Sequence, residues 1–138
     1  MAEFACNMQK IFTDTQNQLL SALGDSLKVL NIRIGFHCGK VTAGVLRGDK
    51  CRFQLFGNTV NVAARFEQNG APGMIQVSEE VKNELINAGV GTWLIERPEG
   101  IYAKGVGRLK AFWIVPERVT GYETTIIAGT GEEFKEIV

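Results

Sequence analysis

The strongest constraint on the fold is a change of hydrophobic period near the start of the chain. Apolar side chains recur at steps of three, four and seven positions through residues 1–23, which predicts one amphipathic helix. The apolar positions are Phe4, Met8, Ile11, Phe12, Leu19, Leu20 and Leu23. Residues 31–37 instead alternate, with Ile32, Ile34 and Phe36 on one side and polar residues on the other. A helix followed by a half-buried strand predicts a fold in which helices cover a sheet.

Further along, the same two patterns predict several more strands and helices. The predicted strands cover residues 41–46, 51–56, 74–77, 92–96, 101–104 and 109–115, and the predicted helices cover residues 60–68 and 79–87. The Gly-Asp pair within residues 47–50 suits a hairpin between the first two of these strands. Asn58 or Thr59 is expected to cap the first helix, and Ser78 the second.

The composition is that of one ordinary globular domain and argues against several functions. We expect the domain to cover residues 1–115 and a loose tail to cover residues 116–138, where the pattern fades. The 15 basic residues balance 15 acidic ones, so no nucleic-acid partner is expected. Apolar stretches fall far short of the ~20 residues of a membrane span, which argues against direct membrane insertion. Three cysteines without a CxxC pair indicate reduced thiols rather than disulfides or zinc ligands.

Two glycine-containing stretches lack the spacing of nucleotide-binding loops. Residues 35–41 are one residue short of a P-loop and lack the Ser or Thr that holds its metal. Residues 104–107 lead into a predicted strand and lack the third glycine of a dinucleotide fingerprint. The second stretch is better interpreted as a turn that brings Lys104 close to an anion.

The segment from Phe53 to Arg65 is the most informative part of the chain. Asn61 and Arg65 are four positions apart on a predicted helix and therefore share a face. An amide beside a guanidinium suits phosphate oxygens or a ribose. A solvated helix face has the same spacing, so the spacing alone leaves both interpretations open.

Five segments together resemble the class III nucleotide cyclase catalytic domain, the family of adenylate and guanylate cyclases. They are residues 31–39, 41–45, 53–65, 75–78 and 101–107, and they follow the order and spacing of the carboxy-terminal two thirds of that domain. The block Gly57-Asn-Thr-Val-Asn-Val-Ala63, followed by Arg65, is the most specific of them. The resemblance implies a ferredoxin-like α+β sandwich, with a mixed or antiparallel sheet and helices, that is incomplete at its amino end.

The resemblance also implies roles for individual residues. Family members pair head to tail, and each active site lies between two domains. Matched residue by residue, Asn61 would orient the ribose, Arg65 would stabilise charge on the α-phosphate, and Lys104 would hold the triphosphate. Gln54 would read the purine edge, and Arg33 would reach the phosphates from the metal-bearing side.

The metal ligands of the family are not expected in this chain. In the family, two aspartates hold two Mg or Mn ions and lie upstream of the helix that residues 1–23 resemble. We therefore expect both ions to take their ligands from a partner or from a missing amino-terminal segment. Asp14 and Asp25 lack the intervening hairpin and are expected to be solvated charges. His37 is expected to make a structural hydrogen bond, so no residue here is assigned to a metal.

The expected function is conversion of GTP or ATP to the cyclic 3',5'-monophosphate and pyrophosphate, in a homodimer or heterodimer with a second cyclase domain. The alternative is a non-catalytic half-site or regulatory dimerisation module that completes a partner domain. The Gln54 amide suits either base, and the lack of an adenine-type aspartate there favours GTP. Phe56 would wall the purine pocket or pack in the core. Without the metal aspartates the chain alone is expected to be inactive, and its location is cytoplasmic or the cytosolic part of a membrane-bound cyclase.

Overall fold

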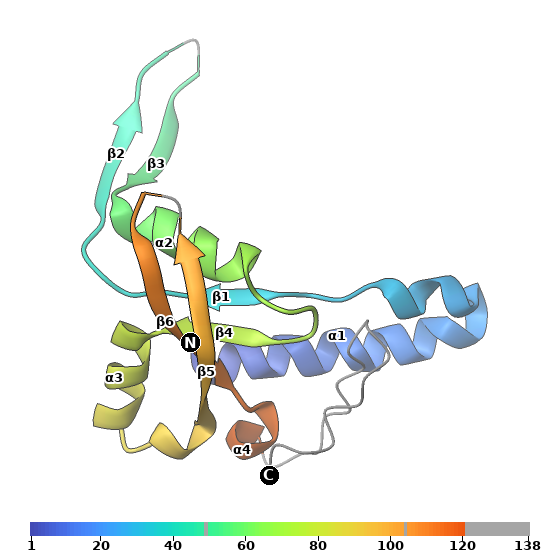
Figure 1. The fold of residues 1–138 in the computed structure, drawn as a ribbon. Coiled ribbons are helices and arrows are strands. Elements are labelled where there is room, and N and C mark those ends of the chain that lie inside the picture. The colour runs from blue at the N-terminus through green and yellow to red at the C-terminus, as the bar shows by residue number, and fades with distance from the viewer. Residues whose placement is uncertain (49, 104, 121–138) are drawn as a thin grey trace.

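A computed structural model of the chain describes residues 1–48, 50–103 and 105–120. In chain order the elements are α1 (Ala2–Leu23), the 3-10 helix η1 (Asp25–Val29), β1 (Ile34–Phe36), β2 (Thr42–Leu46), β3 (Arg52–Phe56), α2 (Asn58–Gln68), β4 (Ile75–Ser78), α3 (Glu79–Asn87), the 3-10 helix η2 (Gly91–Trp93), β5 (Leu94–Ala103), β6 (Gly107–Ile114) and α4 (Pro116–Thr120) (Figure 1). The long helix and both shorter helices predicted from the sequence are confirmed.

Four strands form a mixed sheet in the order β1-β4-β6-β5 (Figure 1). β1 runs parallel to β4, with Ile34 beside Ile75, and β6 is antiparallel to both β4 and β5. β2 and β3 pair with each other as the predicted antiparallel hairpin, which projects from the body of the molecule. A mixed sheet covered by helices confirms the predicted α+β class.

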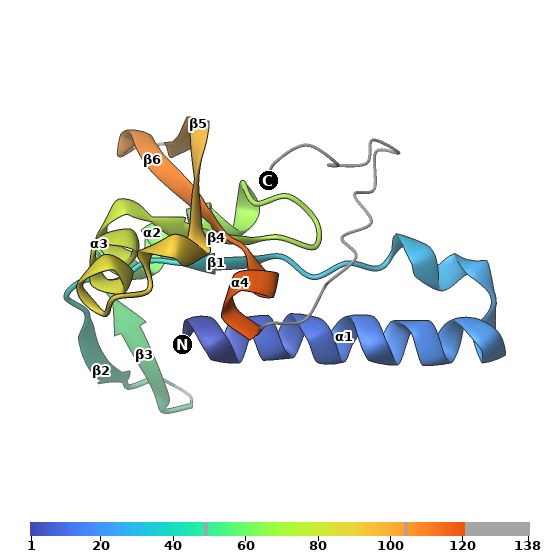
Figure 2. The same cartoon turned by 90° about the horizontal axis from the view of Figure 1, so that it is seen from below.

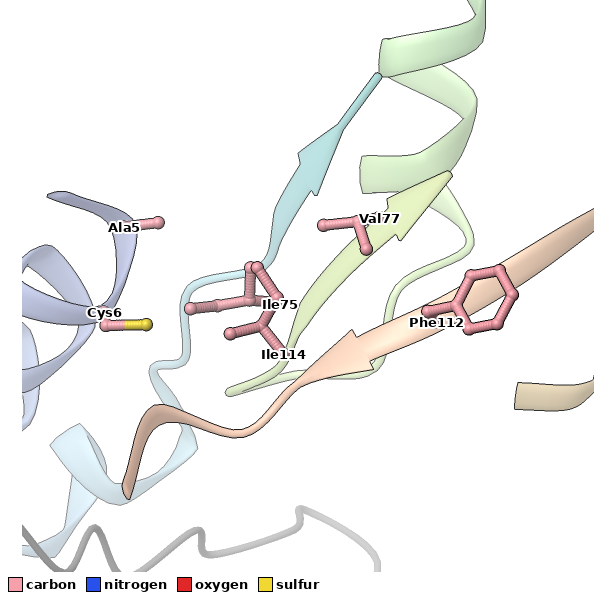
Figure 3. Packing of buried hydrophobic residues seen from close by; sticks show 6 residues of the cluster. All are labelled: Ala5, Cys6, Ile75, Val77, Phe112 and Ile114. Carbon is pink, nitrogen blue, oxygen red and sulfur yellow. The ribbon is translucent and has the colours of Figure 1, made fainter. Parts of the chain in front are cut away.

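The main hydrophobic core lies between α1 and one face of the sheet. Its buried side chains are Ala5, Cys6, Ile75, Val77, Phe112 and Ile114 (Figure 3). Successive residues of a strand point to opposite faces, so Ile75 and Val77 lie on the side of α1. Val81 and Leu85 of α3 and Val119 of α4 pack against the same cluster. Three helices therefore border this core.

The helix α2 covers the opposite face of the sheet. Its buried residues pack with two strands in a second cluster of Val62, Phe66, Ile101 and Ala111. Gln76 of β4 points to this side and is fully buried. Its side-chain oxygen accepts a hydrogen bond from Nη1 of Arg97 on β5, at 3.0 Å. The side-chain oxygen therefore has a charged partner, whereas Nε2 of Gln76 is buried without a hydrogen-bond partner among the described residues.

The packing of α1 differs from what its apolar pattern predicts. The buried residues of α1 are Ala5, Cys6 and Gln9, of which Ala5 and Cys6 pack in the main core, whereas Phe4 and Ile11 are 62% and 65% exposed. Small side chains let the first turns of α1 approach the sheet closely. Figure 2 shows that the rest of the helix runs beyond the sheet edge, where no strand covers it. The helix is confirmed, but most of its apolar stripe is exposed.

The N-terminal caps of α3 and α2 can be compared with the caps predicted from the sequence. Ser78 caps α3 as predicted, because its Oγ accepts a hydrogen bond from the backbone N–H of Val81 at 3.5 Å. The predicted cap of α2 is wrong, since the N-cap residue is Gly57, which makes no side-chain bond. Its φ of 129° is a conformation that favours glycine. Thr59 instead donates its hydroxyl to the carbonyl of Lys40 at 2.7 Å.

The two strands predicted over residues 92–96 and 101–104 are one strand, β5. The prediction of a break at Pro98 is wrong, although the pairing with β6 does shift register between Arg97 and Ile101. β5 is an edge strand, and a proline is tolerated where its missing N–H would face solvent. The irregularity is a bulge within a strand rather than a turn between two.

The segment predicted to be a loose tail starts with the short helix α4. The backbone of this helix lies beside α1, and Arg118 donates from Nη1 to the carbonyl of Thr92 at 2.9 Å. The rest of the predicted tail, residues 121–138, lies outside the described residues. Within the described ranges, no helix has the length and apolar character to span a bilayer.

Candidate functional site

The candidate site is built on the hairpin β2–β3 and the helix α2 that follows it. Gly57 joins the end of β3 directly to the start of α2. A Cβ at this position would lie 3.5 Å from the carbonyl oxygen of Lys40, so the preceding loop passes close to the junction. The strand and the helix are thus held at a fixed angle by a residue whose positive φ favours glycine.

The register of the hairpin places the predicted base-reading residues on one face. Gln54 pairs with Gly44 and Phe56 with Thr42, and both of these cross-strand pairs lie on the same side. Gly44 leaves room above it, since a Cβ there would touch the Phe56 ring at 3.8 Å. Gln54 and Phe56 are both exposed, which suits a pocket wall and contradicts core packing of Phe56.

Arg52 belongs to the same face as Gln54, although the sequence analysis did not select it. It lies two positions before Gln54 on β3 and pairs with Leu46. The alternation of the strand was the signal that could have found it, since residues two apart share a face. Arg52 is exposed, so its guanidinium is available to an anion or to a base carbonyl.

Asn61 and Arg65 lie one helical turn apart on the exposed side of α2. The opposite side of the helix carries Val62 and Phe66, which are buried against the sheet. Nη1 of Arg65 donates to Oε1 of Gln68 at 2.8 Å, a contact within the same helix. The amide and the guanidinium are thus presented together on a helix whose other face is fixed by packing.

Arg33 forms an ion pair that the sequence analysis missed. Its Nη2 lies 3.1 Å from Oε1 of Glu67 on α2, and both side chains are about half exposed. An exposed pair of this kind stabilises a fold by about 0–1 kcal/mol, so a phosphate could replace the carboxylate at small cost. The two residues are far apart in the sequence, and no local pattern links them.

The contact between β1 and α2 is unusually close. A Cβ on Gly35 would lie 2.1 Å from the backbone nitrogen of Glu67. Two residues further along, the His37 ring is parallel to the ring of Phe66, with centroids 6.3 Å apart and an interplanar angle of 7°. The predicted structural hydrogen bond of His37 is confirmed, since its Nδ1 lies 2.9 Å from Oγ of Ser78.

Lys104, the predicted triphosphate ligand, lies outside the described residues. In the turn that leads into β6, Gly105 and Gly107 have φ values of 88° and 100°. Both values are in the region that favours glycine, so the turn needs these residues. The other predicted site residues fall on three elements, with Arg33 just before β1, Gln54 and Phe56 on β3, and Asn61 and Arg65 on α2.

The candidate site residues do not fit a divalent cation. Mg²⁺ and Mn²⁺ take oxygen ligands, mostly carboxylates. In the part of the chain that the structure describes, no three His, Cys, Asp or Glu side chains gather closely enough to hold a metal ion. The candidate site residues instead carry guanidinium groups and amides, which suit phosphate oxygens, a ribose or a purine edge. No chemical step is therefore assigned to a metal held by this chain.

Comparisons with known proteins agree on one family. The model of the adenylate and guanylate cyclase catalytic domain matches residues 1–116. Receptor-type guanylate cyclase gcy-20 of Caenorhabditis elegans is 41% identical over 93 residues, which is 67% of this chain and 8% of that protein. Atrial natriuretic peptide receptor 2 of Homo sapiens is 39% identical over 89 residues, 64% of this chain and 8% of the receptor.

Among solved structures, the crystal structure of the adenylyl cyclase CyaB from P. aeruginosa has the same fold. It matches 82% of this chain and 56% of its own with a TM-score of 0.70, at 22% identity. The chain spans about 8% of the length of the two curated relatives above.

Proposed function

Because the chain belongs to the adenylate and guanylate cyclase catalytic-domain family, we propose that it supplies one half of a nucleotide cyclase active site. The half-site holds the base, the ribose and the α-phosphate of a purine nucleoside triphosphate. The observation that carries the proposal is the exposed pair of Asn61 and Arg65 on α2, the helix that directly follows the hairpin strand carrying Gln54.

In the proposed reaction the ribose 3'-hydroxyl attacks the α-phosphorus and pyrophosphate leaves. Negative charge gathers on the nonbridging oxygens in the transition state, where a fixed guanidinium stabilises it more than in the ground state. Arg65 has this role, and the Asn61 amide orients the ribose. Lys104 holds the triphosphate in the same half-site. Arg33 would instead reach phosphates from the metal-bearing side of a site, by exchanging Glu67 for a phosphate oxygen.

GTP is the favoured substrate in this proposal, and ATP is the alternative. The named relatives are guanylate cyclases or a natriuretic peptide receptor. Gln54 can present its NH₂ to the guanine carbonyl, and the Arg52 guanidinium on the same face adds a second donor. Adenine offers an amino group at that edge, which Gln54 would meet with its carbonyl oxygen.

The partner is a second cyclase domain, in a homodimer or a heterodimer, and the two Mg or Mn ions bind on the partner's side. The back of the hairpin supports such a partner. The pairs Ala43–Leu55 and Val45–Phe53 lie on the face opposite Gln54, and all four residues are exposed and apolar. Contiguous exposed apolar surface of this kind is typical of protein interfaces.

A second candidate function is a regulatory dimerisation module without catalysis. It is favoured by the same apolar hairpin face, which would bind a partner domain whether or not a nucleotide is turned over. In either case we place the chain in the cytosol, alone or as part of a receptor-type cyclase like its relatives.

The test is cyclic nucleotide formation from GTP and from ATP with manganese. The chain is assayed alone and mixed with a cyclase domain that keeps its metal aspartates but lacks the arginine. We expect turnover in the mixture only, with GTP preferred. Arg65→Ala should lower the rate about several hundredfold, since removing one such donor costs about 3–4 kcal/mol.

Gln68→Ala is the matched control, because it removes the helix partner of Arg65 and keeps the guanidinium. Turnover that persists in Arg65→Ala would contradict the proposed half-site. Binding of the partner without any turnover would support the dimerisation module instead.

A further inference from the structure

The carboxy-terminal half of α2 is attached to β1 at three successive points. Arg33 pairs with Glu67, Gly35 lies directly under the backbone of Glu67, and the ring of His37 is parallel to that of Phe66. Arg33 lies just before β1, Gly35 within it and His37 just after it, and all three contact α2. Phe66 follows Arg65 in the helix, so contacts on this buried side determine where the exposed side lies.

His37 also reaches the first turn of α3. Its side chain is only 10% exposed, and Nδ1 lies 2.9 Å from Oγ of Ser78 and 3.4 Å from Oε2 of Glu80. Ser78 is the N-cap of α3 and also accepts the backbone N–H of Val81. One buried ring thus connects the end of β1, the inner face of α2 and the cap of α3.

The surroundings of His37 determine which of its ring nitrogens carries the proton. Burial of Glu80 opposes ionisation, but hydrogen bonds from Ser78 and from the Glu80 backbone, together with His37, lower the pKa of Glu80 below its ordinary value. An ionised carboxylate beside Nδ1 repels a lone pair there and attracts an N–H. The Ser78 hydroxyl then donates to Glu80 and accepts from Nδ1 and from the backbone N–H of Val81.

We propose that His37 is a positioning residue that carries its proton on Nδ1 and holds α2 against the cap of α3. Its Nδ1–H bond to Ser78 and its stacking on Phe66 fix the orientation of α2, and so of Asn61 and Arg65. The consequence for turnover rests on the proposed function of Arg65. The tautomer and the coupling between α2 and α3 do not.

The first experiment is nitrogen-15 NMR of the intact chain, in which His37 is the only histidine. We expect the neutral ring to show a protonated Nδ1 and an unprotonated Nε2. Glu80→Gln should shift the balance toward the Nε2–H form, because it removes the negative charge that favours a proton on Nδ1. A neutral ring protonated on Nε2 in the unmodified chain would overturn the proposal.

The second experiment measures kcat and KM in the mixture with a metal-bearing partner. His37→Ala should lower kcat about tenfold to a hundredfold with KM nearly unchanged, as expected when a transition-state group is misplaced. His37→Asn should recover most of the rate, because its amide nitrogen can occupy the place of Nδ1. A kcat of His37→Ala equal to that of the unmodified chain would contradict the proposal.

Lys110→Met is the matched control. It breaks the ion pair between Lys110 and Glu79, which also ties down the first turn of α3. Lys110 is two residues from Phe112 of the main core and therefore lies on the face of the sheet opposite α2. We expect kcat to stay unchanged in this variant. An equal loss in both variants would reduce His37 to a general stabiliser of α3. If His37→Ala does not fold, Ser78→Ala removes the same bond from the other side and should lower kcat in the same way.

Amide hydrogen exchange separates this proposal from the proposed function. If no mixture turns nucleotide over, the proposed function fails, yet the coupling can still be read from residues 61–66. Exchange there should rise about tenfold or more in His37→Ala and remain unchanged in Lys110→Met, since only the first variant loosens the attachment of α2. Unchanged exchange in His37→Ala would overturn the proposal independently of activity.

Discussion

The strands β4 and β3 lie in regions of opposite character. All four residues of β4 are buried, whereas all five residues of β3 are exposed. β4 has a neighbour on each side, β1 and β6, and helices over both faces, while β3 has only β2. A two-stranded hairpin is at most marginally stable in water by itself. The stability of the chain therefore comes from the four-stranded sheet and its helices, and the hairpin that carries Gln54 adds little to it.

The two regions differ in whether their side chains stabilise the folded chain or remain accessible to a ligand or partner. Buried residues such as Ile75 and Ile114 contribute burial energy but are inaccessible to a ligand. Exposed residues such as Phe53 and Leu55 contribute little to the isolated chain and are free to gain that energy when a partner covers them. Five predictions test this division, beginning with the largest expected effect.

Cysteine reactivity compares the two regions directly. Cys6 is buried in the core and Cys51 is exposed at the start of β3. Burial, with smaller contributions from Glu117 and Glu3, raises the pKa of Cys6 from 9.0 to about 11. The thiolate is the reactive form, so we expect Cys6 to be alkylated more than about a hundredfold more slowly than Cys51. Peptide mapping by mass spectrometry after timed alkylation measures the ratio.

The same raised pKa predicts the direction of a pH effect. In the unfolded chain the thiol of Cys6 ionises near pH 9, before the folded one, so the unfolded state holds fewer protons between pH 9 and about 11. Its contribution to stability is therefore complete below pH 9 and is lost as the pH rises through that window. Cys6→Ala should reduce this decline of the free energy of unfolding with pH in urea melts. For the alkylation experiment, equal rates at Cys6 and Cys51 would mean that the core around Cys6 is accessible to solvent.

Truncation of large apolar side chains should affect the two regions very differently. Ile114→Ala leaves a cavity in the core and should lower the free energy of unfolding by about 2–5 kcal/mol. Leu55→Ala removes a half-exposed side chain and should change it by less than about 0.5 kcal/mol. Urea denaturation followed by circular dichroism measures both. A large loss in Leu55→Ala would show that the hairpin packs against something in the isolated chain.

Much of the four-stranded sheet and its helices could be predicted, because their apolar residues recur with the regular periods of strands and helices. The alternation at 31–37, the Ser78 cap and the helix over 79–87 depend on neighbouring residues alone, and each was predicted. The packing of α1 could not be predicted. The apolar pattern shows which side of the helix is hydrophobic, but not whether a sheet covers that side. The continuous strand β5 was missed because a proline on an edge strand is tolerated only by virtue of the sheet order.

The candidate site shows the same limit. The shared face of Asn61 and Arg65 follows from helical spacing and was predicted. The ion pair of Arg33 with Glu67 and the contact of Gly35 with α2 are tertiary, so no sequence pattern announces them. Short segments thus suffice to predict which candidate residues share a face, whereas the tertiary contacts that hold them in place depend on residues far apart in the sequence.

The junction between the two regions is tested at Gly35. A methyl group there would overlap backbone atoms of α2, with the nearest at 2.1 Å, and backbone cannot move aside as a flexible side chain does. Gly35→Ala should therefore destabilise the chain by about 1–3 kcal/mol and displace α2. Gly48→Ala is the control, because nothing lies within 4 Å of its added Cβ. Equal urea midpoints for the two variants would mean that the attachment of α2 to β1 is loose.

A charge on the back of the hairpin is expected to have the smallest effect on the stability of the fold. Its expected effect is on association with a partner domain. Leu55→Asp places a carboxylate on the apolar face formed with Ala43, Val45 and Phe53. The isolated chain should unfold at an unchanged urea concentration, because the side chain is already exposed to water. Association with a metal-bearing cyclase domain should weaken about tenfold to a hundredfold, since the interface would then have to bury an unpaired charge.

Tyr102→Asp is the matched control for Leu55→Asp. Tyr102 is 73% exposed on β5, in the four-stranded sheet, so the variant adds the same charge at an exposed position away from the hairpin. Analytical ultracentrifugation of each variant with the partner domain should show weak association for Leu55→Asp and normal association for Tyr102→Asp. Equal weakening would mean that added charge acts through long-range repulsion, and normal association of both would move the partner surface off the hairpin. A loss confined to Leu55→Asp would instead mean that the region contributing least to folding contributes most to assembly, because its apolar surface is still uncovered when the chain has folded.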